Sequence, residues 1–125
     1  MSPTVVIADD DSDIRALVKI SAIRAGLEVV GEAADGDEAW AAIQRTVPDL
    51  AILDVSMPGH NGLEICRLVR ADSALDEVQI LLVSAAADDA SIAAGIRAGA
   101  ADYLSKPFSP RELASRLAEH MGGTR

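Results

Sequence analysis

Short apolar runs alternate with stretches of helical periodicity, and this alternation limits most strongly how the chain can fold. The runs cover residues 5–8, 29–33, 50–53, 80–83 and 101–104. The first, third and fourth runs are nearly unbroken in apolar character, which is typical of strands that are buried on both faces of a parallel sheet. The alternation therefore predicts an α/β fold with five strand–helix units, a parallel sheet, and helices on both faces.

The segments between the runs carry helix start and stop signals. Helices are expected over residues 12–24, 37–45, 63–71 and 90–98, with Gly26 and Gly99 as stops after the first and the fourth. The last helix begins with a capping box formed by Ser109 and Glu112, with Pro110 at its first position. Gly95 weakens the fourth helix by about 1 kcal/mol relative to Ala, so either mobility or a close packing contact is expected there.

Length, charge and cysteine content narrow the class of protein. The 125 residues, half of them hydrophobic, suit one domain, expected over residues 1–121, with residues 122–125 as a tail or the start of a linker. A formal charge of −9 disfavours direct contact with nucleic acid or an acidic membrane. Cys66, the single cysteine, cannot form an internal disulfide. No signal peptide or long apolar run is present, so a cytoplasmic protein is expected.

Polar side chains follow four of the five runs, at the strand ends where open α/β sheets bind their ligands. They are Asp9, Asp10 and Asp11 after the first run, Asp54 after the third, Ser84 after the fourth and Lys106 after the fifth. Carboxylates this close repel one another, and a hard cation such as Mg²⁺ relieves the repulsion. Together with a lysine and a hydroxyl for an anion, they indicate phosphoryl chemistry in which one carboxylate is the nucleophile.

The order and spacing of several short motifs indicate a family. They are Asp9-Asp10, Leu53-Asp54-Val55-Ser56-Met57-Pro58-Gly59, Gly62, Ser84-Ala85, and Tyr103-Leu104-Ser105-Lys106-Pro107-Phe108. Along essentially its whole length the chain resembles the receiver domain of two-component response regulators. The resemblance implies a flavodoxin-like, doubly wound sheet with strand order 2-1-3-4-5. It also implies a signalling domain that catalyses its own phosphorylation and dephosphorylation, rather than an enzyme acting on other molecules.

The resemblance also implies roles for the residues at the strand ends. Asp54 would be the phosphoacceptor. Asp9, Asp10, Asp54 and the backbone carbonyl of Ser56 would hold Mg²⁺, or Mn²⁺ in its place. Lys106 would pair with the phosphoryl oxygens.

Further implied roles concern signal transmission and partners. Ser84 would move inward to the phosphate, the Tyr103 ring would turn inward after it, and the Lys106–Pro107 bond would be cis. The phosphodonor would be a sensor histidine kinase or phosphotransfer protein, and DNA would be reached only through an effector outside this segment, with transcription as the output. A homodimer is expected through the fourth helix, fifth strand and fifth helix, with cross-subunit ion pairs among Asp102, Arg97, Arg111 and Arg116.

Several alternatives remain open from the sequence. A chain that ends here would be a stand-alone receiver acting through protein contacts. A magnesium-dependent phosphohydrolase shares the aspartate nucleophile, but Ser56 stands where such enzymes have their second acid. A flavodoxin-like binding module would need a phosphate loop after the first strand, and none is present. Asp11 could cap the first helix rather than approach the metal, and Tyr103, Trp40 and Cys66 could simply be core residues.

Overall fold

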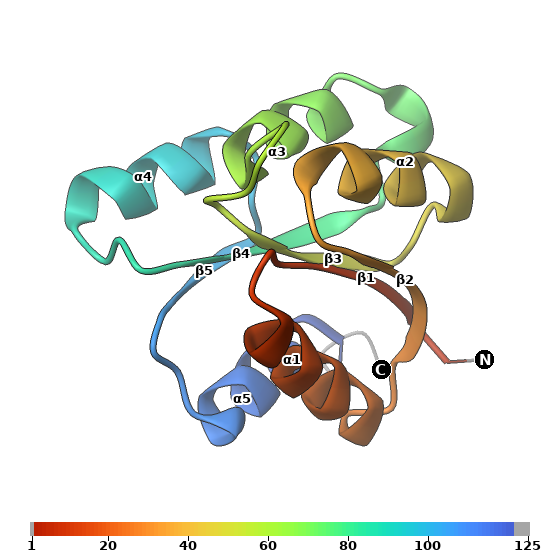
Figure 1. Cartoon of the computed structure of the whole chain (residues 1–125). Helices are drawn as coiled ribbons and strands as arrows, with labels where there is room; N and C mark the ends of the chain where they lie inside the picture. Colours follow the sequence, from red (N-terminus) through yellow and green to blue (C-terminus); the bar gives the residue numbers. More distant parts are fainter. Residues whose placement is uncertain (1, 122–125) are drawn as a thin grey trace.

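Five parallel strands form a central sheet with helices on both of its faces (Figure 1). The computed structural model describes residues 2–121. The strands are β1 (Thr4–Ala8), β2 (Glu28–Ala33), β3 (Leu50–Asp54), β4 (Gln79–Ser84) and β5 (Asp102–Ser105). The helices are α1 (Ser12–Arg24), α2 (Gly36–Thr46), α3 (Gly62–Arg70), α4 (Asp89–Arg97) and α5 (Pro110–Met121), with a 3₁₀ turn, η1 (Ser73–Leu75), after α3. The strand order β2-β1-β3-β4-β5 confirms the predicted topology.

The predicted bounds are correct for α1 and differ by one or two residues elsewhere. α2 and α3 begin one residue earlier than predicted, because the side chains of Asp35 and Asn61 accept hydrogen bonds from backbone amides in the first turns of these helices. β5 was expected at residues 101–104, but its pairing with β4 begins at Asp102, opposite Leu81. The 3₁₀ turn was not predicted. The expected tail at residues 122–125 lies outside the described residues.

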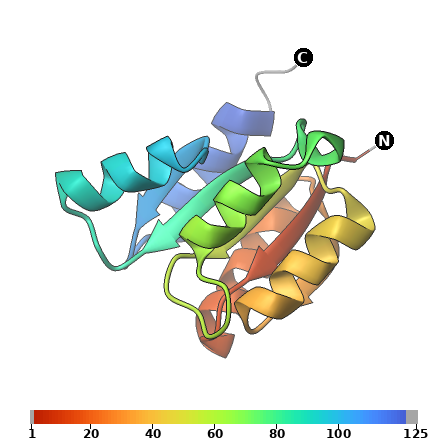
Figure 2. The ribbon, with the colours of Figure 1, turned by 90° about the horizontal axis from the view of Figure 1, so that it is seen from above.

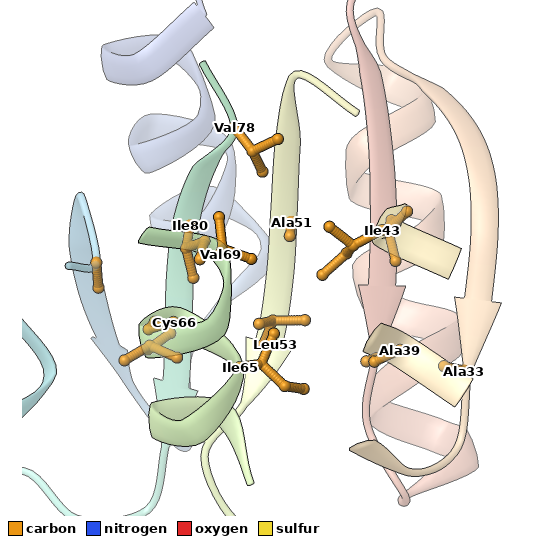
Figure 3. Close-up of a cluster of buried hydrophobic side chains, with 14 of the residues drawn as sticks. Ala33, Ala39, Ile43, Ala51, Leu53, Ile65, Cys66, Val69, Val78 and Ile80 are labelled. Carbon is orange, nitrogen blue, oxygen red and sulfur yellow. The ribbon is translucent and has the colours of Figure 1, made fainter. Parts of the chain in front are cut away.

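The sheet separates two buried apolar clusters. Figure 1 shows α1 and α5 on one face and α2, α3 and α4 on the other. Alternate residues of each strand point to opposite faces, so that Val6 of β1 joins one cluster and Val5 joins the other. Figure 3 shows the first of these clusters, in which Ile43 from α2 and Ile65 from α3 pack on the sheet beside Leu53. Burial on both faces explains why the strands read as apolar runs.

Cys66 and Trp40 have structural places in this cluster, as expected. Cys66 is fully buried on α3, and burial raises the pKa of its thiol to about 12. Trp40 of α2 is half-buried against the cluster. No helix within residues 2–121 is long and apolar enough to cross a lipid bilayer.

Two helix starts and one glycine agree with the sequence reasoning. Asp11 caps α1, since its carboxylate accepts from the amides of residues 13 and 14 at 2.9 and 3.3 Å. Ser109 and Glu112 form the predicted capping box, with reciprocal bonds of 2.9 and 3.0 Å. Gly95 has a packing reason: a Cβ atom there would lie 2.9 Å from Cδ2 of Tyr103. Close contact with the sheet therefore explains this glycine.

Candidate functional site

The candidate site lies at the edge of the sheet where β1, β3 and β5 end. Asp9 follows the last residue of β1, Asp54 is the last residue of β3, and Lys106 follows β5. β1 and β3 are paired neighbours, so their carboxyl ends carry Asp9 and Asp54 to the same edge. Lys106 lies at this edge because it directly follows the last residue of β5. The peptide bond between Lys106 and Pro107 is cis, as expected.

Lys106 lies between two buried carboxylates. Its Nζ is 3.0 Å from Oδ2 of Asp9 and 3.4 Å from Oδ2 of Asp54. Asp9 and Asp54 are only 3% and 5% exposed, whereas Asp10 is exposed. Asp9, Asp10 and Asp54 each offer a carboxylate oxygen, and these oxygens lie within 4.8 Å of one another. The structure thus brings together the four charged residues that were predicted to meet.

Burial and mutual repulsion change the ionisation of this cluster. Burial, followed by the negative charge of Asp9, raises the pKa of Asp54 from 3.8 to about 6, although Lys106 and the Ser56 amide act in the opposite direction. Burial alone would lower the pKa of Lys106, but its hydrogen bond to Asp9 and the charges of Asp54 and Asp9 outweigh this effect and raise it. The site therefore has a protonated lysine and excess negative charge that a cation would relieve.

Backbone contacts hold the carboxylates in place. Oδ1 of Asp9 accepts from the amide of Asp11 at 2.9 Å, and Oδ1 of Asp54 accepts from the amide of Ser56 at 3.3 Å. Nη1 of Arg15, on α1, donates to the backbone carbonyl of Asp9 at 2.8 Å. Arg15 was not predicted as part of the site, because a charged residue on the polar face of a helix gives no signal in a single sequence.

The loop that follows Asp54 is fastened to the start of α2. The Gly36 amide donates to the Pro58 carbonyl at 2.9 Å, and Nδ1 of His60 lies 2.8 Å from Oδ1 of Asp37. These contacts join the loop after Asp54, which contains Ser56, to the start of α2. His60, which was expected only to decorate this loop, helps to hold it.

Ser84 and Tyr103 are connected through the backbone of one residue, Ala86. Oγ of Ser84, at the end of β4, accepts from the Ala86 amide at 3.0 Å. The hydroxyl of Tyr103, on β5, donates to the Ala86 carbonyl at 2.7 Å. Tyr103 as a whole residue is 7% exposed, so it is buried in this structure. Its movement stays a prediction.

Asp102 and Arg116 form an ion pair within the chain. Nη1 of Arg116 lies 2.7 Å from Oδ1 of Asp102, and Nε2 of His120 lies 3.1 Å from Oδ2. Burial alone would raise the pKa of Asp102, but hydrogen bonds from His120, the Tyr103 amide and Arg116 outweigh it and hold the pKa below its ordinary value. These contacts form an intramolecular network between β5 and α5, and the cross-subunit pairing stays a prediction.

The fold and the site together define the class of protein. The doubly wound sheet carries three carboxylates and a lysine at its carboxyl edge. The sequence profile of the response regulator receiver domain matches residues 5–118. The chain therefore belongs to the response regulator receiver domains and to two-component signalling.

Relatives with known names agree with this membership. The chain is 36% identical over 119 residues to the DNA-binding response regulator MtrA of Mycobacterium tuberculosis, covering 94% of the chain and 50% of that protein. It is 37% identical over 114 residues to the phosphate regulon transcriptional regulatory protein PhoB of Pseudomonas aeruginosa, covering 91% and 49%. The chain thus spans about half the length of these relatives.

Solved structures show the same fold. The chemotaxis response regulator CheY4 of Vibrio cholerae is 34% identical with a TM-score of 0.89, and the match covers 97% of this chain and 100% of that one. The receiver domain of NarL from Mycobacterium tuberculosis is 32% identical with a TM-score of 0.89, and the match covers 98% of each chain.

Proposed function

We propose that this domain accepts a phosphoryl group on Asp54 from the phosphohistidine of a sensor histidine kinase or phosphotransfer protein. The observation that carries the proposal is the placement of Asp54. It is a buried carboxylate at a strand end, 3.4 Å from the Lys106 amine and close to Asp9 and Asp10. A nucleophile, a cation for the transferred oxygens, and two further acids are the groups that phosphoryl transfer to a carboxylate requires.

In the proposed reaction, a carboxylate oxygen of Asp54 attacks the phosphorus atom. A phosphorus–oxygen bond forms, the phosphorus–nitrogen bond breaks, and its electron pair returns to the donor imidazole. Lys106 then exchanges its contact with the Asp54 carboxylate for one with a phosphoryl oxygen, which keeps the charge on the new group neutralised. Asp54 reacts as the ionised carboxylate, and with a pKa of about 6 it is mostly ionised at neutral pH.

The residues around Asp54 fit a divalent metal ion. Three carboxylates with oxygens within 4.8 Å of one another form an all-oxygen donor set, to which the Ser56 backbone carbonyl adds a fourth oxygen. Such a set suits the hard cations Mg²⁺ or Mn²⁺ and does not suit softer metals. When bound, the ion would neutralise charge on the phosphoryl oxygens. Asp10, the exposed acid, would be a ligand that solvent can reach.

We propose that the phosphoryl state is passed to the surface of α4, β5 and α5 through Ser84 and Tyr103. Withdrawal of the Ser84 hydroxyl toward the phosphate would break its 3.0 Å bond with the Ala86 amide. The Ala86 carbonyl accepts from Tyr103, so a shift of this residue changes the hydrogen bond that holds the ring. The negative charge added to Asp54 by phosphorylation would thus change the contact between Tyr103 and Ala86, and with it the surface of α4, β5 and α5.

For the output we propose transcription through an effector domain outside this segment, in a protein of the cytoplasm. Support comes from the names of the relatives, of which MtrA is described as DNA-binding. The surface of α4, β5 and α5 would serve as a homodimer interface. A stand-alone receiver is the alternative.

Phosphorylation by a small donor tests the central proposal. Wild type, Asp54→Asn and the control Asp11→Asn are incubated with acetyl phosphate and Mg²⁺, and intact mass is recorded. Asp11 is a matched control because it is a neighbouring carboxylate that caps α1. Wild type and Asp11→Asn should each gain one phosphoryl group and Asp54→Asn none. Equal labelling of Asp54→Asn would refute the proposal, and release of many phosphates per chain would indicate a hydrolase.

A further inference from the structure

A cavity of about 580 Å³ opens between the last turns of α3 and α4. Figures 1 and 2 both show these helices side by side on the same face of the sheet. Helices in such a fold run antiparallel to the strands, so their carboxyl ends lie at the edge where the strands begin. The cavity is therefore at the opposite edge from Asp54 and is separate from the proposed phosphorylation site.

Three arginines line this cavity, and its other lining residues are alanine or glycine. Arg67 and Arg70 come from α3 and Arg97 comes from α4. Among residues 2–121, no carboxylate forms an ion pair with any of the three. In a chain with a net charge of −9, an unneutralised group of three guanidinium ions with space between them requires an explanation.

The helix dipoles account for only part of this positive charge. Each helix carboxyl end carries about half a negative charge, so the two ends together offset about one of the three arginines. Arg24 and Arg45 lie in the last turns of α1 and α2, yet neither of them lines this cavity. Dipole complementation alone would therefore give single arginines at each helix end rather than three around one opening.

Arg70 is held in place by the backbone around it. Nη1 donates to the Asp76 carbonyl at 3.5 Å, and Nη2 donates to the Val78 carbonyl. Gly99 has a φ of +113°, and a Cβ atom there would collide with the Arg70 side chain. The wall of the cavity is thus fixed, while the guanidinium groups of Arg67 and Arg97 make no hydrogen bond to the described residues and are free to take a ligand.

A second cavity, of about 340 Å³, continues from the first along α3. The two share Arg67 and Ala71, and the second adds His60, Glu64 and Leu68, so that the groove runs along α3 toward the loop that follows Asp54. The first cavity offers guanidinium groups, which bind phosphate oxygens in pairs. The second offers the His60 ring and the apolar Leu68 side chain for an organic group, beside the Glu64 carboxylate, which accepts from the Asn61 amide at 2.8 Å. Both volumes lie in the range of small-molecule sites.

We propose that this groove binds a nucleotide carrying at least two phosphate groups, with the phosphates between Arg67 and Arg97 and the nucleoside beside His60. Such binding would tie α4 to α3. Ala94, which lines the cavity, is adjacent to Gly95, which packs on Tyr103. The ligand would therefore act on the helix that carries the proposed output surface. The proposal does not depend on phosphorylation of Asp54.

The test is a titration of the isotope-labelled protein by NMR in EDTA at physiological salt. EDTA removes divalent cations that could bridge a phosphate to the carboxylates of Asp9, Asp10 and Asp54. Salt screens the net charge of the protein. The probes are ADP, inorganic pyrophosphate and citrate. We expect saturable binding of ADP with a Kd of about 1 mM or tighter, shifts at the amides near Gly99, weaker binding of pyrophosphate, and none of citrate.

The double variant Arg67→Gln with Arg97→Gln should weaken ADP binding about tenfold or more. The double variant Arg24→Gln with Arg45→Gln is the matched control, since it removes the same charge from the last turns of two other helices, and it should bind as wild type does. Native spectra verify the fold of both variants. Equal weakening in the two variants, equal binding of citrate, or no saturable ADP binding would overturn the proposal. Pyrophosphate binding as tightly as ADP would likewise overturn the part assigned to the nucleoside.

Discussion

Replacing Asp54 with asparagine should stabilise the metal-free protein at neutral pH, because the fold disfavours the charge of this carboxylate. Burial and the neighbouring Asp9 raise the pKa of Asp54 from 3.8 to about 6. The unfolded chain has the ordinary value, so between about pH 4 and about pH 6 the folded state binds more protons than the unfolded state. The free energy of unfolding therefore decreases as the pH rises through this window and stays low above it.

The size of the effect follows from the two pKa values. They differ by about 2 pH units, and each unit corresponds to about 1.4 kcal/mol, so the ionised carboxylate lowers stability by about 3 kcal/mol. Asparagine keeps an oxygen that can accept from the Ser56 amide. It loses the charge attraction to Lys106, but Lys106 keeps its ion pair with Asp9 at 3.0 Å. We expect a net gain of about 2 kcal/mol at pH 8, or roughly 6–10 °C in Tm for a chain of this length.

Thermal unfolding followed by circular dichroism in EDTA measures this gain. Wild type, Asp54→Asn and Asp10→Asn are compared from pH 4 to pH 8. Asp10→Asn removes the same charge from an exposed side chain at the same edge, so its gain should be smaller. The gain for Asp54→Asn should shrink toward pH 4, where wild-type Asp54 becomes protonated. An Asp54→Asn protein that is no more stable than wild type at pH 8, or a gain independent of pH, would refute the reasoning.

Three further predictions concern other parts of the molecule. Mg²⁺ should raise the Tm of wild type and have a much smaller effect on Asp10→Asn or Asp54→Asn, as measured by thermal unfolding over a Mg²⁺ series; equal shifts would contradict the proposed ligands. Gly95→Ala should destabilise by about 1 kcal/mol in urea titration, because crowding against Tyr103 exceeds the gain in helix propensity; a more stable variant would show that the contact is loose. Cys66 should not react with a thiol reagent at pH 8 until urea unfolds the chain, since its thiol is buried with a pKa of about 12; rapid native labelling would disagree.

Much of the fold could be predicted because its signals are local. Apolar runs at residues 50–53 and 80–83 correspond to strands buried on both faces, and the Ser109–Glu112 capping box is a pattern of four consecutive residues. Element ends were predicted less well. The start of β5 depends on its register with β4, and register is a property of two segments that are distant in the sequence.

The grouping of Asp9, Asp54 and Lys106 was also predicted, because strand ends of a parallel sheet meet at one edge. The contacts of Arg15 and the intramolecular pairing of Asp102 with Arg116 were not. Both depend on where a long side chain on one helix reaches the backbone or carboxylate of another element. A single sequence contains no information on that distance.

The sequence by itself determined the fold class, the family and the residues that gather at the carboxyl edge, because hydrophobic periodicity, caps and motif spacing are written along the chain. Only the tertiary structure decided which groups are buried, and hence that the pKa of Asp54 is raised and that Tyr103 is part of the core. It also decided that the arginines of α3 and α4 surround one cavity. Burial and charge proximity arise between residues far apart in the chain, so they exist only once the helices have packed on the sheet.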